Sequence, residues 1–352
     1  MPKILLHLGF DYFSKGRTGV GSYAGNIIWG LNCDYDIVVP PGVETTELLP
    51  KNAHPVELSG LKKKIMGLLK KFVPISFFFK GYDVAITGGF CFKHSKKTKQ
   101  IIIVHDLMSF TEPQNYKLKQ RLFHKIAASS YKQADLIIAV SQSTKQALHD
   151  LFKIDFNKIV VIPNITNFFI ERNNHEKNDF LFIGDMRKTK NLHFLILGYS
   201  EYVKKYNGKE RLIIAGSKKY EYESLVNLVK KLSLEDKVIF SGYVTEEQKL
   251  SYFSHAKAFV FLSDNEGFGI PLLEAGVNGI PVLCSDIPVF SEVLNDDFAV
   301  YVDNKSPEKI AAGFRKVRGK VVLQENCEKL RQKYSVKLFN EKINDLIRNI
   351  SD

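Results

Sequence analysis

The chain has 352 residues, of which 45% are hydrophobic and 25% are charged. This length exceeds the ~250–300 residues at which a single core stops growing, so we expect two domains, and the composition excludes a disordered chain. The longest apolar runs fall short of the ~20 residues that a bilayer-spanning helix needs. The four cysteines form no C-x-x-C pair, which favours reduced thiols in a cytoplasmic protein over a disulfide or zinc framework. The first residues lead straight into a strand-like Ile-Leu-Leu, so we expect no signal peptide.

Two series of short apolar strands alternate with helical patterns along the chain. In the first half, strands are expected at residues 3–8, 36–40, 82–87, 100–105, 134–140 and 158–163, and helices at 119–132 and 143–152. In the second half, strands are expected at 179–183, 211–215, 237–241, 258–262, 280–284 and 298–302, and helices at 192–206, 222–232 and 245–253. This alternation predicts an α/β protein with parallel sheets that are covered on both faces.

The composition also suggests where the chain divides. The stretch 167–178 is rich in Asn and charge and is interpreted as a linker between a domain at 1–166 and a second domain at 179–334. Residues 335–352 have the pattern of a separate C-terminal helix.

The basic excess of the chain lies in its first half. The net charge is +12, and residues 1–165 hold 22 basic and 12 acidic residues, against 28 and 26 in the remainder. Apolar residues at helical spacing interleave with a group of lysines, namely Lys62, Lys63, Lys64, Lys70 and Lys71. We interpret this segment as a basic amphipathic helix that contacts an anionic membrane. The alternative is an ordinary helix with solvated lysines, and no nucleic-acid-binding motif accompanies the charge.

Residues 266–274, with the sequence EGFGIPLLE, predict a glycine-rich turn that opens a helix. Gly267 and Gly269 allow a tight backbone path with exposed N–H groups, and Pro271 suits the first helical turn. A helix N-terminus behind such a loop binds anions, and phosphate best. Glu266 and Glu274 cannot bind phosphate, so we expect their carboxylates to accept hydrogen bonds from hydroxyl groups. The pattern therefore predicts a diphosphate joined to sugars, as in a nucleotide sugar.

The same stretch resembles the E-x7-E motif of retaining glycosyltransferases of the GT-B fold, most closely glycosyltransferase family 4. The resemblance continues through EAGVNGIPV (274–282) and SDIPVFSE (285–292) and is weaker in the N-terminal half. It implies two Rossmann-like, doubly wound domains that face a central cleft. The first would bind the acceptor and the second the nucleotide sugar, while the C-terminal helix would cross back to the first domain.

The resemblance also implies roles for the residues of the motif. Glu266 would hold hydroxyls of the donor sugar, and Glu274 would hold the ribose. The loop between them would contact the donor through Gly267, Phe268, Gly269 and Ile270.

Ligands of open parallel sheets bind at the carboxyl ends of the strands, where two more segments lie in the first half. Gly19 and Gly21 open a helix after the first strand and resemble the N-terminal glycine-rich loop of the family; a plain strand-to-helix turn is the alternative. His105 ends the fourth strand-like run, and the resemblance implies that it contacts the donor sugar rather than having only a structural role. We expect Asp106 to cap the following turn.

Residues 182–192 resemble the family segment in which an arginine and a lysine bind the diphosphate. Lys190 matches the lysine, but Asp185 stands where many members have the arginine, so we expect Arg187, or alternatively Lys188, to substitute for it. At another strand end the resemblance assigns the nucleotide base to Tyr243 and Val244, although Tyr243 is also suited to the core.

The resemblance implies a retaining hexosyltransferase. Lys190, Arg187 and the helix N-terminus after Gly269 are fixed positive groups that would stabilise the leaving diphosphate, so we expect no metal ion and no cofactor. Asp34 and Asp36 form a D-x-D pattern, but it precedes a strand and is interpreted as coincidence. Similarity to bacterial mannosyltransferases favours GDP-mannose as the donor, with UDP-hexose or dTDP-rhamnose as alternatives. The expected acceptor is a lipid-linked or cell-surface glycan of polysaccharide or lipopolysaccharide biosynthesis, at the inner face of the plasma membrane.

Two other protein classes are weighed against this interpretation. A GT-B phosphorylase or epimerase is disfavoured by the chain length and by the His105 and Glu266 pattern. A catalytically idle protein that binds a nucleotide sugar or glycan for another transferase stays an alternative, because the family arginine is displaced.

Overall fold

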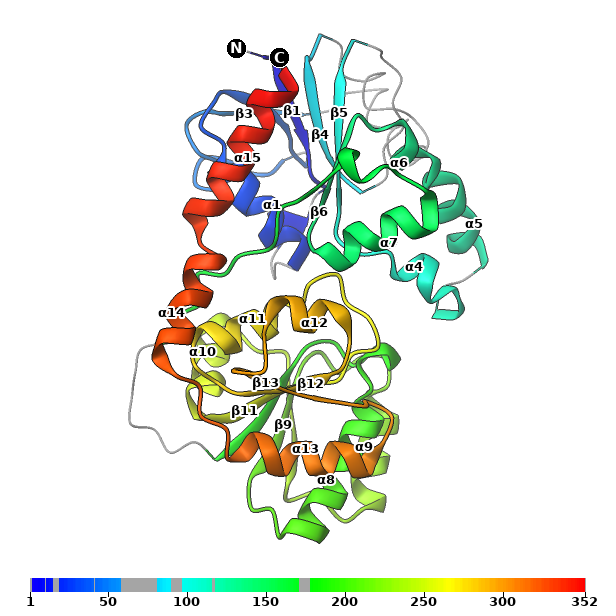
Figure 1. The fold of residues 1–352 in the computed structure, drawn as a ribbon, viewed down its shortest axis with the longest axis vertical. Coiled ribbons are helices and arrows are strands. Elements are labelled where there is room, and N and C mark those ends of the chain that lie inside the picture. The colour runs from blue at the N-terminus through cyan, green and yellow to red at the C-terminus, as the bar shows by residue number, and fades with distance from the viewer. Residues whose placement is uncertain are drawn as a thin grey trace. The chain divides into compact units, whose positions relative to one another are not determined.

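The computed structural model describes residues 2–9, 11–14, 19–40, 42–57, 81–89, 97–115, 118–170 and 178–351. The chain divides into two compact units, unit 1 (Met1–Ile165 and Tyr334–Asp352) and unit 2 (Thr166–Lys333). Each unit contains one sheet in which every described pair of neighbouring strands is parallel (Figure 1). The α/β class with parallel sheets that the sequence predicts is therefore confirmed.

The sheet of unit 1 has seven strands among the described residues. Their spatial order is β3 (Ala53–Val56), β2 (Tyr35–Val38), β1 (Ile4–His7), β4 (Val84–Gly88), β5 (Lys99–Val104), β6 (Leu136–Ala139) and β7 (Ile159–Val161). Six of them were predicted, and β3 was missed. Its Pro55 lacks an N–H group, which sequence reasoning takes as evidence against a strand, but β3 lies at the edge of the sheet, where a proline is tolerated.

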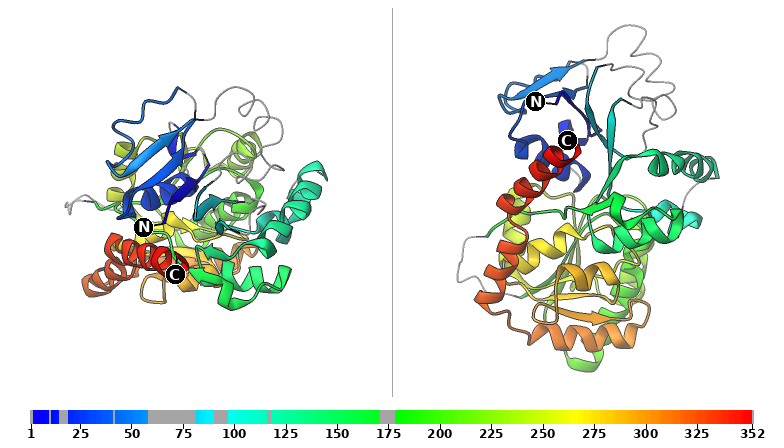
Figure 2. Two further views of the ribbon diagram at one scale, coloured as in Figure 1. Left: turned by 90° about the horizontal axis from the view of Figure 1, so that it is seen from above. Right: turned by 45° about the horizontal axis from the view of Figure 1, so that its top comes forward.

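The described helices of unit 1 lie in the connections between its strands, except for the last, which follows unit 2 in the chain. They are η1 (Asp11–Phe13), α1 (Gly19–Gly30), α4 (Met108–Thr111), η2 (Pro113–Asn115), α5 (Leu118–Ala127), α6 (Ser129–Gln133), α7 (Gln142–Phe152), η3 (Phe156–Lys158) and α15 (Val336–Ser351). The single helix predicted at 119–132 is divided into α5 and α6. The last helix, α15, runs beside α1 (Figures 1 and 2). The Asn344 side chain donates to the carbonyl of Gly30 and accepts from the backbone amide of Asn32.

The sheet of unit 2 has six described strands, all of which were predicted to within two residues at each end. Their spatial order is β10 (Val238–Gly242), β9 (Arg211–Ala215), β8 (Asp179–Ile183), β11 (Ala256–Phe261), β12 (Val282–Ser285) and β13 (Ala299–Val302). Phe180, Leu181 and Phe182 of β8 are all buried. Continuous burial without alternation is typical of a parallel strand that is covered on both faces.

Helices cover both faces of this second sheet. They are η4 (Lys188–Lys190), α8 (Leu192–Tyr206), α9 (Tyr222–Lys231), α10 (Glu246–His255), α11 (Ile270–Val277), α12 (Pro288–Val293), α13 (Pro307–Arg318) and α14 (Gln324–Lys333). Helices α8 and α13 pack side by side on one face, and α10 and α11 lie on the other (Figure 1). Within the described parts of both units, no helix combines the length and apolarity needed to span a membrane.

Candidate functional site

The candidate site lies between β8 and β11 of unit 2, where the order in which the chain adds strands changes from one side of the sheet to the other. Strands β8 and β11 are adjacent and parallel, so their carboxyl ends meet at one edge. From β8 the chain continues to β9 on one side, and from β11 it continues to β12 on the other. Such a switch point is where open α/β sheets bind ligands, because the two loops diverge and leave room between them.

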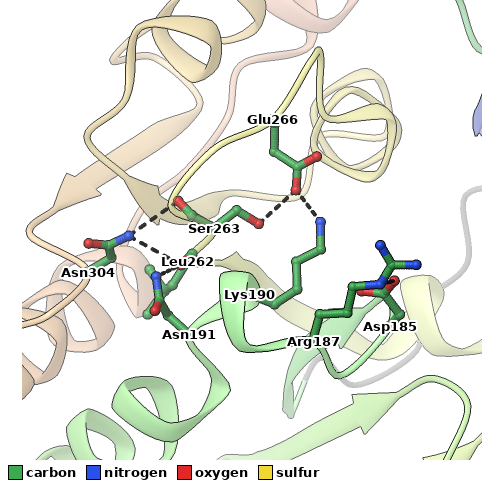
Figure 3. A network of polar contacts seen from close by, with 8 residues as sticks. All are labelled: Asp185, Arg187, Lys190, Asn191, Leu262, Ser263, Glu266 and Asn304. Carbon is green, nitrogen blue, oxygen red and sulfur yellow. Dashed lines mark hydrogen bonds and ion pairs between the residues drawn. The ribbon is translucent and has the colours of Figure 1, made fainter. Parts of the chain in front are cut away.

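Lys190 and Glu266 form an ion pair at this switch point. Lys190 lies in η4 after β8, and Glu266 lies in the loop after β11. Each side chain is 15% exposed, and the hydroxyl of Ser263 donates to the same carboxylate oxygen at 2.7 Å (Figure 3). The Lys190 ammonium also lies 5.0 Å from the centre of the Phe261 ring. The structure thus brings together a cation and a carboxylate that are 76 positions apart in the chain.

The glycine-rich loop leads from Glu266 into α11. Gly269 precedes the helix with a φ of 95°, and a Cβ atom there would lie 3.1 Å from the Phe290 ring. The positive φ favours glycine, and a Cβ atom would also press tightly against the ring. Phe268 is buried, Gly267 is half-buried, and Ile270 is the first residue of the helix. The predicted turn that opens a helix is therefore present, with Gly269 in a left-handed conformation directly before α11.

Glu274 lies inside α11 and is only 5% exposed. One carboxylate oxygen accepts from the Lys249 ammonium at 2.6 Å, while the other has no hydrogen-bond partner among the described residues. Burial raises the pKa of Glu274, and the nearby Lys249 opposes that increase. Lys249 in turn lies 4.3 Å from the centre of the Phe168 ring. Glu274 is thus a buried carboxylate with one paired and one unpaired oxygen.

Arg187, the expected substitute for the family arginine, is held by two neighbours. Its Nε lies 2.8 Å from an oxygen of Asp185, the residue at the usual position of that arginine. Its Nη2 donates to the Tyr220 hydroxyl at 3.1 Å, and its guanidinium lies 5.0 Å from the centre of the Tyr220 ring. The side chain is still 55% exposed, so a ligand could reach it. Lys188, the alternative substitute, is exposed.

Tyr243 and Val244 follow β10 at the same edge of the sheet. Tyr243 is 69% exposed, which excludes the alternative that it is a core residue, and Val244 is half-buried. An exposed aromatic ring at a strand end offers a flat apolar surface on which a nucleotide base could stack.

The predicted residues of unit 1 lie around α1 and the end of β5. Gly19 is the first residue of α1, and a Cβ atom on Gly21 would lie 2.9 Å from the carbonyl oxygen of Asp11, so this close approach requires glycine. His105 follows β5, and its ring meets the Tyr23 ring of α1 edge-to-face at 5.2 Å. Asp106 accepts from the amide of Met108 at 3.0 Å, the capping role that the sequence predicts.

Burial makes the stability of unit 1 depend on pH through His105. It lowers the pKa of His105 from 6.5 to about 4, against a weaker opposing effect of Asp11. Because the unfolded chain then binds more protons than the folded chain, stability is lost as the pH falls from 6.5 to 4. At about 1.4 kcal/mol per pKa unit, we expect a loss on the order of 3 kcal/mol.

This prediction is tested by hydrogen exchange of the β5 amides in the wild type and in His105→Gln. The difference in unfolding free energy between the two proteins removes the contribution of other titrating groups. If the difference in unfolding free energy between the two proteins stays the same from pH 6.5 to 4, the His105 imidazole is protonated as easily in the folded unit as in the unfolded chain, and the prediction is wrong.

Several predicted residues lie outside the described part of the chain. These are the membrane candidates Lys62, Lys63, Lys64, Lys70 and Lys71. Among the residues that the structure does describe, no cluster of three or more His, Cys, Asp or Glu side chains could hold a metal ion.

Sequence reasoning missed the polar residues that contact the predicted site residues. Ser263 contacts Glu266, and Lys249 contacts Glu274, from positions that the motif does not include. Tyr220 contacts Arg187 from a loop 33 positions away. Of these three, only Ser263 had a signal in the sequence. It begins the polar stretch directly after β11, and parallel sheets bind ligands at the carboxyl ends of their strands.

Comparison with known proteins gives two family matches. The family described as "Glycosyl transferases group 1" matches residues 163–349, and "Glycosyltransferase Family 4" matches residues 49–167. The chain is 36% identical over 212 residues to the O-antigen chain mannosyltransferase RfbU of Salmonella typhimurium, covering 60% of this chain and 58% of that protein. It is 29% identical over 212 residues to O-antigen chain mannosyltransferase B of Escherichia coli, covering 56% of each. The matches thus span little more than half the length of these relatives.

A solved structure resembles the whole chain. Sucrose-phosphate synthase from Thermosynechococcus elongatus superposes with a TM-score of 0.77 over 99% of both chains. At 18% sequence identity, this likeness establishes a common fold.

Proposed function

The chain belongs to the glycosyl transferases group 1 family and has the GT-B fold, and from this premise we propose that it is a retaining hexosyltransferase that works without a metal ion. The donor in this proposal is a nucleotide sugar, specifically GDP-mannose. The acceptor is a lipid-linked or cell-surface glycan of polysaccharide or lipopolysaccharide biosynthesis. Two O-antigen chain mannosyltransferases among the similar proteins support both assignments.

The observation that carries the proposal is the Lys190–Glu266 ion pair at the switch point of the sheet. An incoming diphosphate competes with Glu266 for the Lys190 ammonium, because it brings more negative charge than one carboxylate. Glu266, once released, can accept hydrogen bonds from hydroxyls of the donor sugar. The pair therefore holds both groups in place before the donor arrives, and the donor exchanges one set of contacts for another.

The proposed reaction breaks the bond between the anomeric carbon and the diphosphate oxygen. Negative charge develops on the leaving diphosphate, and Lys190, Arg187 and the N-terminus of α11 stabilise it. The acceptor hydroxyl oxygen forms the new bond on the face from which the diphosphate leaves. Its proton passes to a phosphate oxygen, so the products are the glycosylated acceptor and a protonated nucleoside diphosphate.

The remaining residues have donor-binding roles in this proposal. Glu274 accepts from the ribose hydroxyls through the oxygen that Lys249 leaves unpaired, and Tyr243 and Val244 contact the base. The loop residues Gly267, Phe268, Gly269 and Ile270 line the phosphate side. In unit 1, Gly19 and Gly21 approach the phosphates through their backbone N–H groups, and His105 contacts a sugar hydroxyl as a neutral imidazole, since its pKa is about 4.

We further propose that the protein works at the inner face of the plasma membrane. The basic excess of residues 1–165 supports contact with anionic lipid. The lysines assigned to this contact lie outside the described residues, so the assignment stays a prediction.

The donor is tested by thermal denaturation with GDP, UDP, dTDP, CMP and ADP and their common sugar conjugates, without added metal. A ligand that binds the folded state raises the melting temperature by mass action. We expect GDP and GDP-mannose to raise it most. Preference for UDP or dTDP would replace the sugar assignment but keep the enzyme class, and no response to any nucleotide would favour the catalytically idle partner. Proton NMR of the transfer product then decides whether the anomeric configuration is retained.

A further inference from the structure

Thr189 and Asn191, the two neighbours of Lys190, form hydrogen bonds with the loop that leads to Glu266. The amide of Asp264 donates to the carbonyl of Thr189 at 2.9 Å. The side-chain amide of Asn191 donates to the carbonyl of Leu262 at 2.9 Å and to Oδ1 of Asp264 at 2.7 Å. Figure 3 shows Asn191 reaching the Leu262 end of this loop beside the ion pair. Lys190 and Glu266 are therefore joined through the backbone of both loops as well as through their charges.

A third segment supports the same loop from beyond β13. The Asn304 side-chain amide lies 3.2 Å from the carbonyl of Ser263 (Figure 3). It also lies 3.1 Å from Oδ1 of Asp264. The Lys305 ammonium lies 3.3 Å from the same carboxylate oxygen. One oxygen of Asp264 thus receives donors from the loops after β8 and β13. We call Thr189, Asn191, Leu262, Asp264 and Asn304 the Asn191 network.

The Asn191 network constrains Lys190 more than the ion pair alone can. Lysine carries its ammonium on a long, flexible side chain, so an ion pair at the end of that chain does not by itself fix the backbone from which the chain extends. Hydrogen bonds to both neighbours of Lys190 fix the backbone from which its side chain extends. Asn191 is 6% exposed and has a φ of 52°, a left-handed conformation that asparagine tolerates. Its own carbonyl then accepts from the amide of Leu195 in the first turn of α8.

We propose that Asn191 and Asp264 are positioning residues that set the place of the Lys190 ammonium relative to Glu266. Its catalytic consequence rests on the proposed function: the same geometry would hold Lys190 against the leaving diphosphate. A displacement of about 1 Å at such a site can cost about 100-fold in rate. Neither residue needs to touch the substrate for this effect.

Asn191→Gly isolates the side-chain bonds, because glycine keeps the left-handed backbone while removing the amide. Asn207 provides a matched control: it follows the other end of α8, has the same φ of 52°, and is exposed. With the full chain and a nucleotide sugar, we expect Asn191→Gly to lower kcat about 10- to 100-fold with little change in KM, and Asn207→Gly to leave both unchanged. Asp264→Ala should behave like Asn191→Gly, whereas Asp264→Asn, which keeps an acceptor oxygen, should retain most of the activity.

A second readout needs no substrate. Acylation of lysine amines, followed by mass spectrometry of the Lys190 peptide, reports how well that ammonium is held and shielded. We expect labelling of Lys190 to increase several-fold in Asn191→Gly and in Asp264→Ala, and to stay at the wild-type level in Asn207→Gly. Unchanged labelling in Asn191→Gly would overturn the positioning role. If the wild type transfers no sugar but Asn191→Gly still exposes Lys190, the proposed function fails while the positioning role stands.

Discussion

Replacing Lys190 with Met is expected to lower kcat about 100- to 1000-fold while leaving affinity for the bare nucleoside unchanged. The reason is that the positive charge of Lys190 acts on charge that develops on the diphosphate, which a nucleoside lacks. A loss of this size corresponds to about 3–4 kcal/mol of transition-state stabilisation. The measurement is a full kinetic comparison with the wild type, together with titration of the nucleoside.

Two further variants sharpen this test. Lys204→Met removes an exposed lysine from the last turn of α8 and should change neither kcat nor nucleoside affinity, which controls for net charge. Lys190→Arg keeps the charge with a different geometry and should recover part of the rate. If Lys190→Met instead weakens nucleoside binding as much as it slows transfer, Lys190 has a general binding role and the leaving-group assignment is wrong.

The strands and their order of appearance could be read from the sequence because parallel, buried strands are short apolar runs. The segment Asp179–Ile183 is an example, because its consecutive phenylalanines and leucine form a short apolar run that is typical of a strand buried on both faces. The edge strand Ala53–Val56 escaped because Pro55 and the exposed His54 give it no apolar run. A strand at an edge needs neither full burial nor every N–H group, so its sequence signal is weaker.

The contacts of the candidate site were harder to predict than its members. Lys190 and Glu266 each follow a strand, which is a local signal, but their pairing depends on the neighbouring positions of β8 and β11 in the sheet. Asn304 lies a further 38 positions along the chain from Glu266, and only the adjacency of β11, β12 and β13 brings it to Ser263. Sequence spacing contains no information about these distances. The departure at Asp185 was visible in the sequence, but its ion pair with Arg187 required the folded loop.

The buried pair of Lys249 and Glu274 gives the second large expected effect. Their side chains are 15% and 7% exposed, and Lys249 is the partner of the one paired oxygen of Glu274. Lys249→Met leaves the carboxylate buried without a counter-charge. We therefore expect a loss of about 3–5 kcal/mol in the stability of unit 2 at pH 8. Hydrogen exchange of the β11 and β12 amides measures this loss in unit 2 alone.

The pH dependence follows from the pKa of Glu274, which burial already raises and which loses the opposing effect of Lys249 in the variant. A carboxyl group with a raised pKa in the folded state destabilises the fold as the pH rises through that pKa, because the unfolded group ionises first. The loss should therefore be smaller at pH 5, where Glu274 can stay protonated. The double variant Lys249→Met with Glu274→Gln removes the charge and should recover most of the stability at pH 8.

The double variant also separates charge from packing. Lys249 packs against Phe168, and methionine retains much of that apolar contact. If the double variant does not recover stability, the loss comes from packing and not from charge.

Nucleotide binding then connects the pair to the proposed role of Glu274. A protonated carboxyl group offers fewer acceptor sites to ribose hydroxyls than a carboxylate, so Lys249→Met should weaken nucleotide binding most at low pH, where its stability loss is smallest. Opposite pH trends for stability and binding in one variant would indicate that Lys249 keeps Glu274 charged for the ribose, whereas parallel trends would mean that it only stabilises the fold.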